Sequence, residues 1–89
     1  MRIILSILLL SVCYPQTEIN SNITSNTTWT LSGSPYNITS DIQLYPNLTL
    51  DIEPGVTING NSKDLINFGT INAIGNQQNK ITFNNLNIS

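Results

Sequence analysis

Short apolar runs, each ended after a few residues by Pro or Gly, constrain the fold of this chain most. In LTLDIEPGVTINGN, residues 48–61, polar residues alternate with five apolar ones, Leu48, Leu50, Ile52, Val56 and Ile58. Such alternation is typical of a strand with one buried face. Pro54 and Gly55 interrupt it, and we expect both, together with Gly75 further on, to form corners, because Pro fixes φ and Gly accepts positive φ. The pattern predicts an all-β fold of short strands with tight corners.

The same pattern recurs later in the chain. Residues 50–55 (LDIEPG) match residues 71–75 (INAIG) at an offset of about 21, and residues 56–59 (VTIN) match residues 81–84 (ITFN) at about 25. A period in the low twenties suits a right-handed parallel β-helix, in which each strand pairs with its counterpart one coil away. We expect about two to three coils. Asn59 and Asn84 fall at equivalent positions, so their amides either stack from coil to coil or merely reflect how common Asn is here.

The first segment has the features of a targeting signal. Arg2 precedes a nearly unbroken apolar run over residues 3–12, which predicts a cleaved secretory signal peptide at residues 1–13 and an extracellular or cell-surface location. The run is too short for a membrane span, which needs about 20 apolar residues. A buried N-terminal strand or helix, and a lipoprotein signal with Cys13 as the lipidated residue, are the alternatives. Residues 14–26 are polar and without period, which predicts a leader or linker before a solenoid at residues 27–89.

Composition narrows the classes of function. Charged residues make up 9% of the chain, its net charge is −2, and it has one Cys and no His. We therefore expect no nucleic-acid binding, no metal site, no disulfide and no cofactor. Five Asn-x-Ser/Thr sequons are candidate N-glycosylation sites, although a chain so rich in Asn, Ser and Thr also produces sequons by chance. They are Asn22, Asn26, Asn37, Asn47 and Asn87.

One long segment resembles a known family. TWTLSGSPYNITSDIQLYPNLTLDIEPGVTING, residues 28–60, followed by TINAIGNQQNKITFNN, residues 70–85, is similar to the first coils of secreted right-handed parallel β-helix proteins. These belong to the pectate-lyase-like superfamily, and the likeness is to its surface-protein and adhesin type. The resemblance implies core and corner residues here, with the catalytic residues of the family's enzymes on later coils. Trp29 is then either a hydrophobic plug over the open first coil or a platform for ligand stacking.

Two hypotheses for function follow. The first is a non-enzymatic structural or adhesive module of a secreted or surface protein, a part of a longer β-helix. It would bind glycans or other surface proteins, or self-associate through the exposed solenoid end. The alternative is the N-terminal piece of a carbohydrate-active enzyme, a lyase or a glycoside hydrolase, which needs carboxylates facing one cleft. The sequence shows no catalytic set, and solvated surface charge is the simpler interpretation of its carboxylates, which are Glu18, Asp41, Asp51, Glu53 and Asp64.

Overall fold

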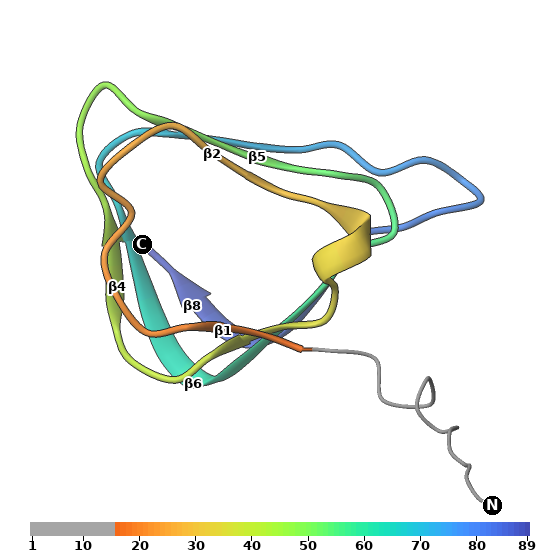
Figure 1. Ribbon diagram of the computed structural model, residues 1–89, viewed down its shortest axis with the longest axis horizontal. Helices are drawn as coiled ribbons and strands as arrows, with labels where there is room; N and C mark the ends of the chain where they lie inside the picture. The colour runs from red at the N-terminus through yellow and green to blue at the C-terminus, as the bar shows by residue number, and fades with distance from the viewer. Residues whose placement is uncertain (1–15) are drawn as a thin grey trace, which may run out of the picture.

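The chain winds into a parallel β-solenoid of about three turns. The computed structural model describes residues 16–89, so the predicted signal peptide at residues 1–13 and Cys13 lie outside the described residues. Figure 1 shows the coils stacked behind one another as a triangular ring. The strands are β1 (Thr17–Ile19), β2 (Thr27–Trp29), β3 (Tyr36–Ile38), β4 (Ile42–Leu44), β5 (Thr49–Ile52), β6 (Thr57–Asn67), β7 (Thr70–Ala73) and β8 (Thr82–Ile88), with a 3-10 turn, η1, at Leu31–Gly33.

Every pair of neighbouring strands runs in parallel, and each strand pairs with its counterpart one coil away. One sheet has the order β1-β3-β6-β4, with β8 added on β6, and the other has the order β2-β5-β7. β6 pairs with both β3 and β4, so this sheet covers two sides of the triangle (Figure 1). Leu50 lies opposite Ile71, and Ile58 lies opposite Phe83. The predicted fold class and both predicted registers are confirmed.

The core is a column of apolar side chains inside the triangle. Alternate strand residues point inward, and residues in register stack from coil to coil, as Tyr36, Ile58 and Phe83 do on one side. This burial is the main stabilising term in a chain with so few charges. The buried residues are Ile23, Trp29, Tyr36, Ile38, Ile42, Leu44, Leu50, Ile52, Val56, Ile58 and Leu65.

The corners use two different devices. Pro54 and Gly55 lie in the turn between β5 and β6. Gly55 has φ +85°, close to the value that the third residue of a type II turn requires, and the Val56 N–H donates to the Glu53 carbonyl at 3.4 Å. Gly75 differs, because its φ is not positive and the turn is made after it, at residues 76–79. Other corners place polar residues in the left-handed region, where Asn is tolerated better than most residues. These are Asn47, Asn61, Ser62 and Asn85.

The predicted leader at residues 14–26 is wrong for residues 17–26. β1 pairs with β3, and buried Ile23 bridges Leu44, so these residues form the first coil. The solenoid therefore does not start at Thr27, as predicted. The reason is local: β1 has three residues and Ile23 makes a single bridge, so neither is long enough to show the alternation by which a strand is identified in a sequence.

Candidate functional site

A ladder of side-chain amides runs along the outer face of β3, β6 and β8. The Asn84 amide donates to the Asn59 carbonyl oxygen at 3.0 Å, and Asn59 donates to Asn37 at 3.0 Å. Asn37 donates in turn to the Gln16 side chain. The hydrogen bond between Asn59 and Asn84 that the repeat suggested is thus present, and the structure extends it by two more amides. Asn37 and Gln16 were missed because the first coils do not repeat visibly in the sequence.

The carboxylates also make hydrogen bonds from one coil to the next, as the ladder amides do. All five Asp and Glu residues of the chain lie in the described part, and each accepts a hydrogen bond from a residue 21 to 23 positions away. The carboxylates therefore join neighbouring coils. The acceptor–donor pairs are Glu18 with the Thr39 hydroxyl, Asp41 with the Asp64 N–H, Asp51 with the Asn72 amide, Glu53 with the Leu31 N–H, and Asp64 with the Asn87 amide.

A shallow hollow beside β5 brings two of these carboxylates together. Asp51 and Glu53 both line it, and its volume is about 450 Å³. The two residues were considered separately in the sequence, but Asp51 lies on β5 and Glu53 directly follows its last residue, so the two carboxylates are near each other. Two carboxylates in one cleft are what glycoside hydrolysis needs. Here, however, Asp51 accepts the Asn72 amide at 3.0 Å and Glu53 accepts the Leu31 N–H at 2.9 Å, so both already hold neighbouring coils.

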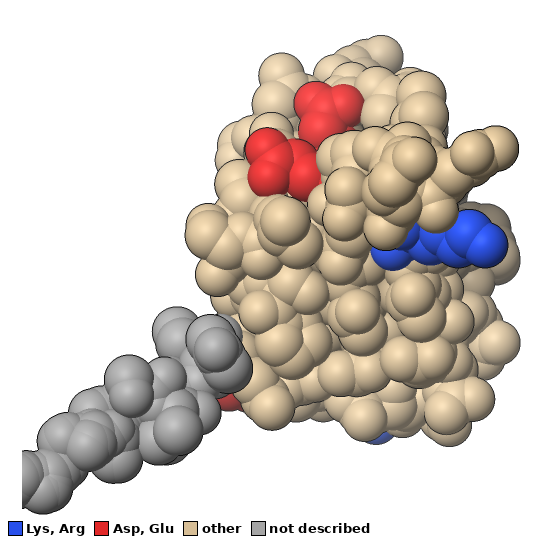
Figure 2. Space-filling model, turned by 90° about the vertical axis from the view of Figure 1, so that its right-hand side faces the viewer, with Lys and Arg blue, Asp and Glu red and all other residues tan. Residues whose placement is uncertain are grey.

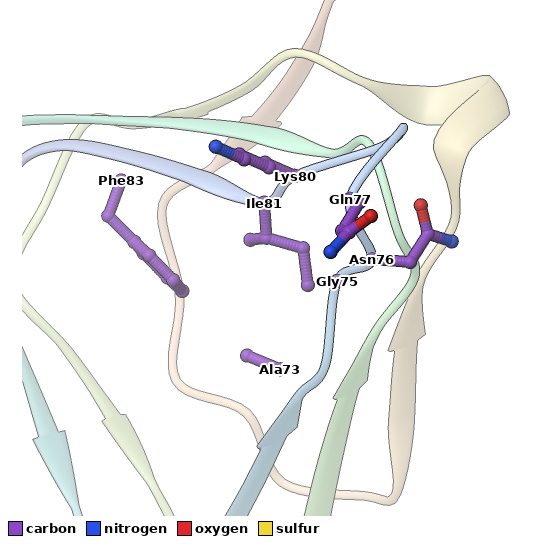
Figure 3. A pocket seen from close by; sticks show the side chains of 7 residues that line it. All are labelled: Ala73, Gly75, Asn76, Gln77, Lys80, Ile81 and Phe83. Atoms are coloured by element: carbon purple, nitrogen blue, oxygen red, sulfur yellow. The ribbon is translucent and has the colours of Figure 1, made fainter.

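A second hollow, which we call the end hollow, opens where the last described coil leaves the core uncovered. It measures about 520 Å³ and lies between β7 and β8. In Figure 3, Ala73 and Ile81 point into it, and Phe83 lies beside them on β8. The remaining lining residues are Gly75, Asn76, Gln77 and Lys80, all in the loop between the two strands. The end hollow therefore combines an apolar floor with a polar rim.

Trp29 is a core residue. It is only 3% exposed, and its ring stacks on Tyr36 with centroids 5.1 Å apart and an angle of 18° between the planes. The Tyr36 hydroxyl donates to the Thr30 carbonyl at 2.9 Å. A ring this deeply buried has no free face for a ligand, which argues against stacking on a glycan. Trp29 lies on β2, an outer strand of its sheet, where the predicted role as an end plug requires it.

The five sequons differ in how far their side chains are engaged. Asn47 is exposed and sits at φ 64° in the turn between β4 and β5. Asn37 is half-buried, and both its amide nitrogen and its amide oxygen make hydrogen bonds in the ladder. Asn22 and Asn26 accept a backbone N–H of the next coil, and Asn87 donates to Asp64. Asn47 is therefore the position best able to carry a glycan without disturbing the solenoid.

The surface of the described residues has few other features that could form a functional site. Residues 16–89 contain no group of three or more residues of types that ligate metals. Figure 2 shows one face of the molecule, on which charged side chains are few and widely spaced apart from one acidic pair. Within the same residues, no helix has the length and hydropathy to cross a membrane.

Comparison with known proteins adds no relative. No family model, curated protein or solved structure matches the chain.

Proposed function

We propose that this chain is a non-catalytic structural module of a secreted or cell-surface protein, built as the first coils of a pectate-lyase-like, adhesin-type β-helix. One observation carries the proposal: every carboxylate of the chain accepts a hydrogen bond from a neighbouring coil. General acid or base catalysis needs carboxyl groups that are free to act on a substrate. These carboxylates are exposed, but each already accepts a hydrogen bond within the protein. The polar side chains on the outside stabilise the solenoid through hydrogen bonds between coils, in addition to the apolar core inside it.

An adhesive role fits the same surface. The amide ladder and the neighbouring Thr residues present hydrogen-bonding groups on a regular, nearly uncharged face, which suits glycans or other surface proteins better than nucleic acid. A glycan array probed with the full chain tests this part. Binding that is lost when Asn59 is replaced by Ala in a folded protein supports adhesion through the ladder. Binding to no glycan and to no surface protein removes the adhesive part and leaves the structural one.

A second candidate function, a piece of a carbohydrate-active enzyme, is favoured by one feature, the hollow shared by Asp51 and Glu53. Substituting amides for these carboxylates separates the two functions. Asp51→Asn and Glu53→Gln keep an acceptor oxygen in place, so a structural module retains its melting temperature, whereas an enzyme loses turnover.

Release of reducing sugar from plant and bacterial polysaccharides is the assay for turnover. We expect none from the wild-type chain. Turnover by the wild type that both amide variants abolish would overturn the structural proposal and establish the enzyme. Asp51→Ala and Glu53→Ala serve as matched variants, because they remove the acceptor as well and should lower the melting temperature.

A further inference from the structure

Asn59 and Gly60 form the one Asn-Gly sequence in the chain. In such a dipeptide the backbone nitrogen of Gly can attack the side-chain amide carbon of Asn. Because Gly has no side chain to obstruct that nitrogen or to restrict its backbone, Asn-Gly is the most reactive of the Asn-x sequences in a flexible chain. Asn is for this reason counted among the thermolabile residues. The strand β6 therefore contains a linkage that is labile by its sequence.

The attack requires a change in the backbone of β6. The Gly60 nitrogen reaches Cγ of Asn59 only if the Asn59 Cα–C bond rotates away from its extended value, which is a ψ of about +115° in a parallel sheet. Asn59 pairs with Asn37 of β3 on one side and with Asn84 of β8 on the other. A Cβ atom placed on Gly60 would lie 2.5 Å from the Asn85 carbonyl oxygen, so β8 packs directly against this peptide unit and hinders its rotation.

The amide ladder holds the side chain of Asn59 as well. Its amide nitrogen donates to the Asn37 carbonyl oxygen at 3.0 Å, and its own carbonyl oxygen accepts the Asn84 amide at 3.0 Å. These two hydrogen bonds run from coil to coil, whereas the Gly60 nitrogen lies along the strand. The side chain has to leave both bonds before Cγ can meet that nitrogen, so the reaction requires a local opening of β6.

We propose that Asn59 is a latent deamidation site, which the folded solenoid protects and which an opening of β6 exposes. In the opened strand a bond forms between the Gly60 nitrogen and Cγ of Asn59. The Cγ–Nδ2 bond breaks, and the proton of the Gly60 N–H leaves with Nδ2 as ammonia. Water then opens the resulting succinimide ring and leaves either Asp or isoaspartate at position 59. The inference concerns the chemistry of this linkage and does not depend on the proposed function.

Either product makes the opening hard to reverse. A carboxylate at position 59 has no N–H to donate to the Asn37 carbonyl oxygen, so two acceptors would face each other in the ladder. Isoaspartate also adds one carbon to the main chain, which displaces the following residues of β6 from their pairing with β4 and β8. A chain that has opened at β6 and reacted would therefore not return to the original ladder.

The first test compares the folded full chain with the same chain unfolded in guanidinium chloride. Asn20, which precedes Ser21, is the internal reference, because it is exposed and lies outside the strands. Peptide mapping by chromatography and mass spectrometry follows Asp and isoaspartate at both positions over time at mildly alkaline pH. We expect Asn59 to convert faster than Asn20 in the unfolded chain and more slowly than Asn20 in the folded chain. Folding should slow conversion of Asn59 at least tenfold, because opening has to precede the reaction.

Two variants at one position test the contribution of the ladder. Asn37→Ala removes the acceptor of the Asn59 amide, whereas Asn37→Asp keeps an acceptor oxygen in place. In the folded proteins we expect Asn59 to convert several-fold faster in Asn37→Ala than in Asn37→Asp. Asn84→Ala, which removes the donor to Asn59, serves the same purpose should Asn37→Ala fail to fold.

Asp51→Ala is the control for a general loss of stability. It removes a hydrogen bond between coils in the other sheet, the one to Asn72, and should leave the conversion of Asn59 unchanged. The proposal is overturned if Asn59 converts equally fast in the folded and unfolded chains, or faster than Asn20 in the folded one. It is also overturned if Asn59 stays intact in the unfolded chain, or if Asn37→Ala, Asn37→Asp and Asp51→Ala all convert Asn59 at one rate.

Discussion

At the scale of single residues, the outside of the solenoid is held by hydrogen bonds that repeat from coil to coil. Asn59 occupies the middle of the amide ladder, where it accepts from Asn84 and donates to Asn37. Such pairing matters because a half-buried amide that loses its partners regains only part of its hydration. The residue that makes two ladder bonds should therefore matter more than the one that makes a single bond at the end.

Replacing Asn59 by Ala should lower the free energy of unfolding by about 1–3 kcal/mol, because two hydrogen bonds of about 0.5–1.5 kcal/mol each are lost. Asn84→Ala, which removes one bond, should cost about half as much. Urea denaturation of the wild type and both variants measures the difference. Equal losses for the two variants would mean that the ladder bonds do not contribute separately.

Replacing Trp29 tests whether its side chain closes the core at the first coil. Truncation to Ala removes a ring that is 3% exposed and stacked on Tyr36, and large aromatic-to-Ala changes in cores cost about 3–5 kcal/mol. We expect a markedly lower melting temperature for Trp29→Ala and a much smaller change for Trp29→Phe, which keeps an aromatic ring against Tyr36. An unchanged melting temperature for Trp29→Ala would rule out the plug.

At the scale of elements, the absence of a side chain at Gly60 allows β6 and β8 to approach closely. A Cβ atom at Gly60 would lie 2.5 Å from the Asn85 carbonyl oxygen and from the Leu86 Cα, both backbone atoms of β8. Backbone cannot give way as a flexible side chain does, so β8 must move as a unit. The close approach sits where the register between the two strands shifts, between Asn59 and Lys63.

Gly60→Ala should therefore destabilise the last coil by about 1–3 kcal/mol, as expected of overpacking. The amides of β8 should exchange with solvent faster in this variant, while those of β3 and β4 keep their rates. Hydrogen exchange followed by mass spectrometry reads both strands at once. Ser62→Ala is the control, since Ser62 is exposed in the same corner. A β8 that exchanges equally in both variants would show that the strand adapts to the added methyl group.

The elements also show how far the sequence could be interpreted. The repeat around Leu50 and Ile71 predicted the parallel pairing, because segments that recur about 21 residues apart favour a solenoid, in which each strand pairs with its counterpart one coil away. The first coil was missed because Ile23 forms only a single bridge. The hollow of Asp51 and Glu53 depends on how the neighbouring strand and corner close around them, which no local pattern encodes. Hydrogen bonds between coils follow from register, so Asn59 and Asn84 were predictable, while Gln16 was not.

At the scale of the whole molecule, each coil contacts only the coils next to it. Stability in such a stack is a sum of terms for single coils and for their interfaces, so the ends are held by one interface and the middle by two. The core reflects this arrangement, because Ile38 and Ile58 in the inner coils are fully buried while Phe83 in the last coil is not. Within residues 16–89, the stack should thus open from its first and last coils rather than all at once.

This gradient is measurable by native-state hydrogen exchange. Amides of β3, β5 and the first half of β6 have a paired strand on both sides, so we expect them to exchange most slowly, at rates that approach those set by global unfolding. Within the described residues, β1 and β8 each have one paired strand, so their amides should exchange faster through local opening. Because local opening exposes little surface, their exchange should also respond less to added denaturant than that of β3. One common rate and one common denaturant response for all strands would mean that the coils unfold as a single cooperative unit.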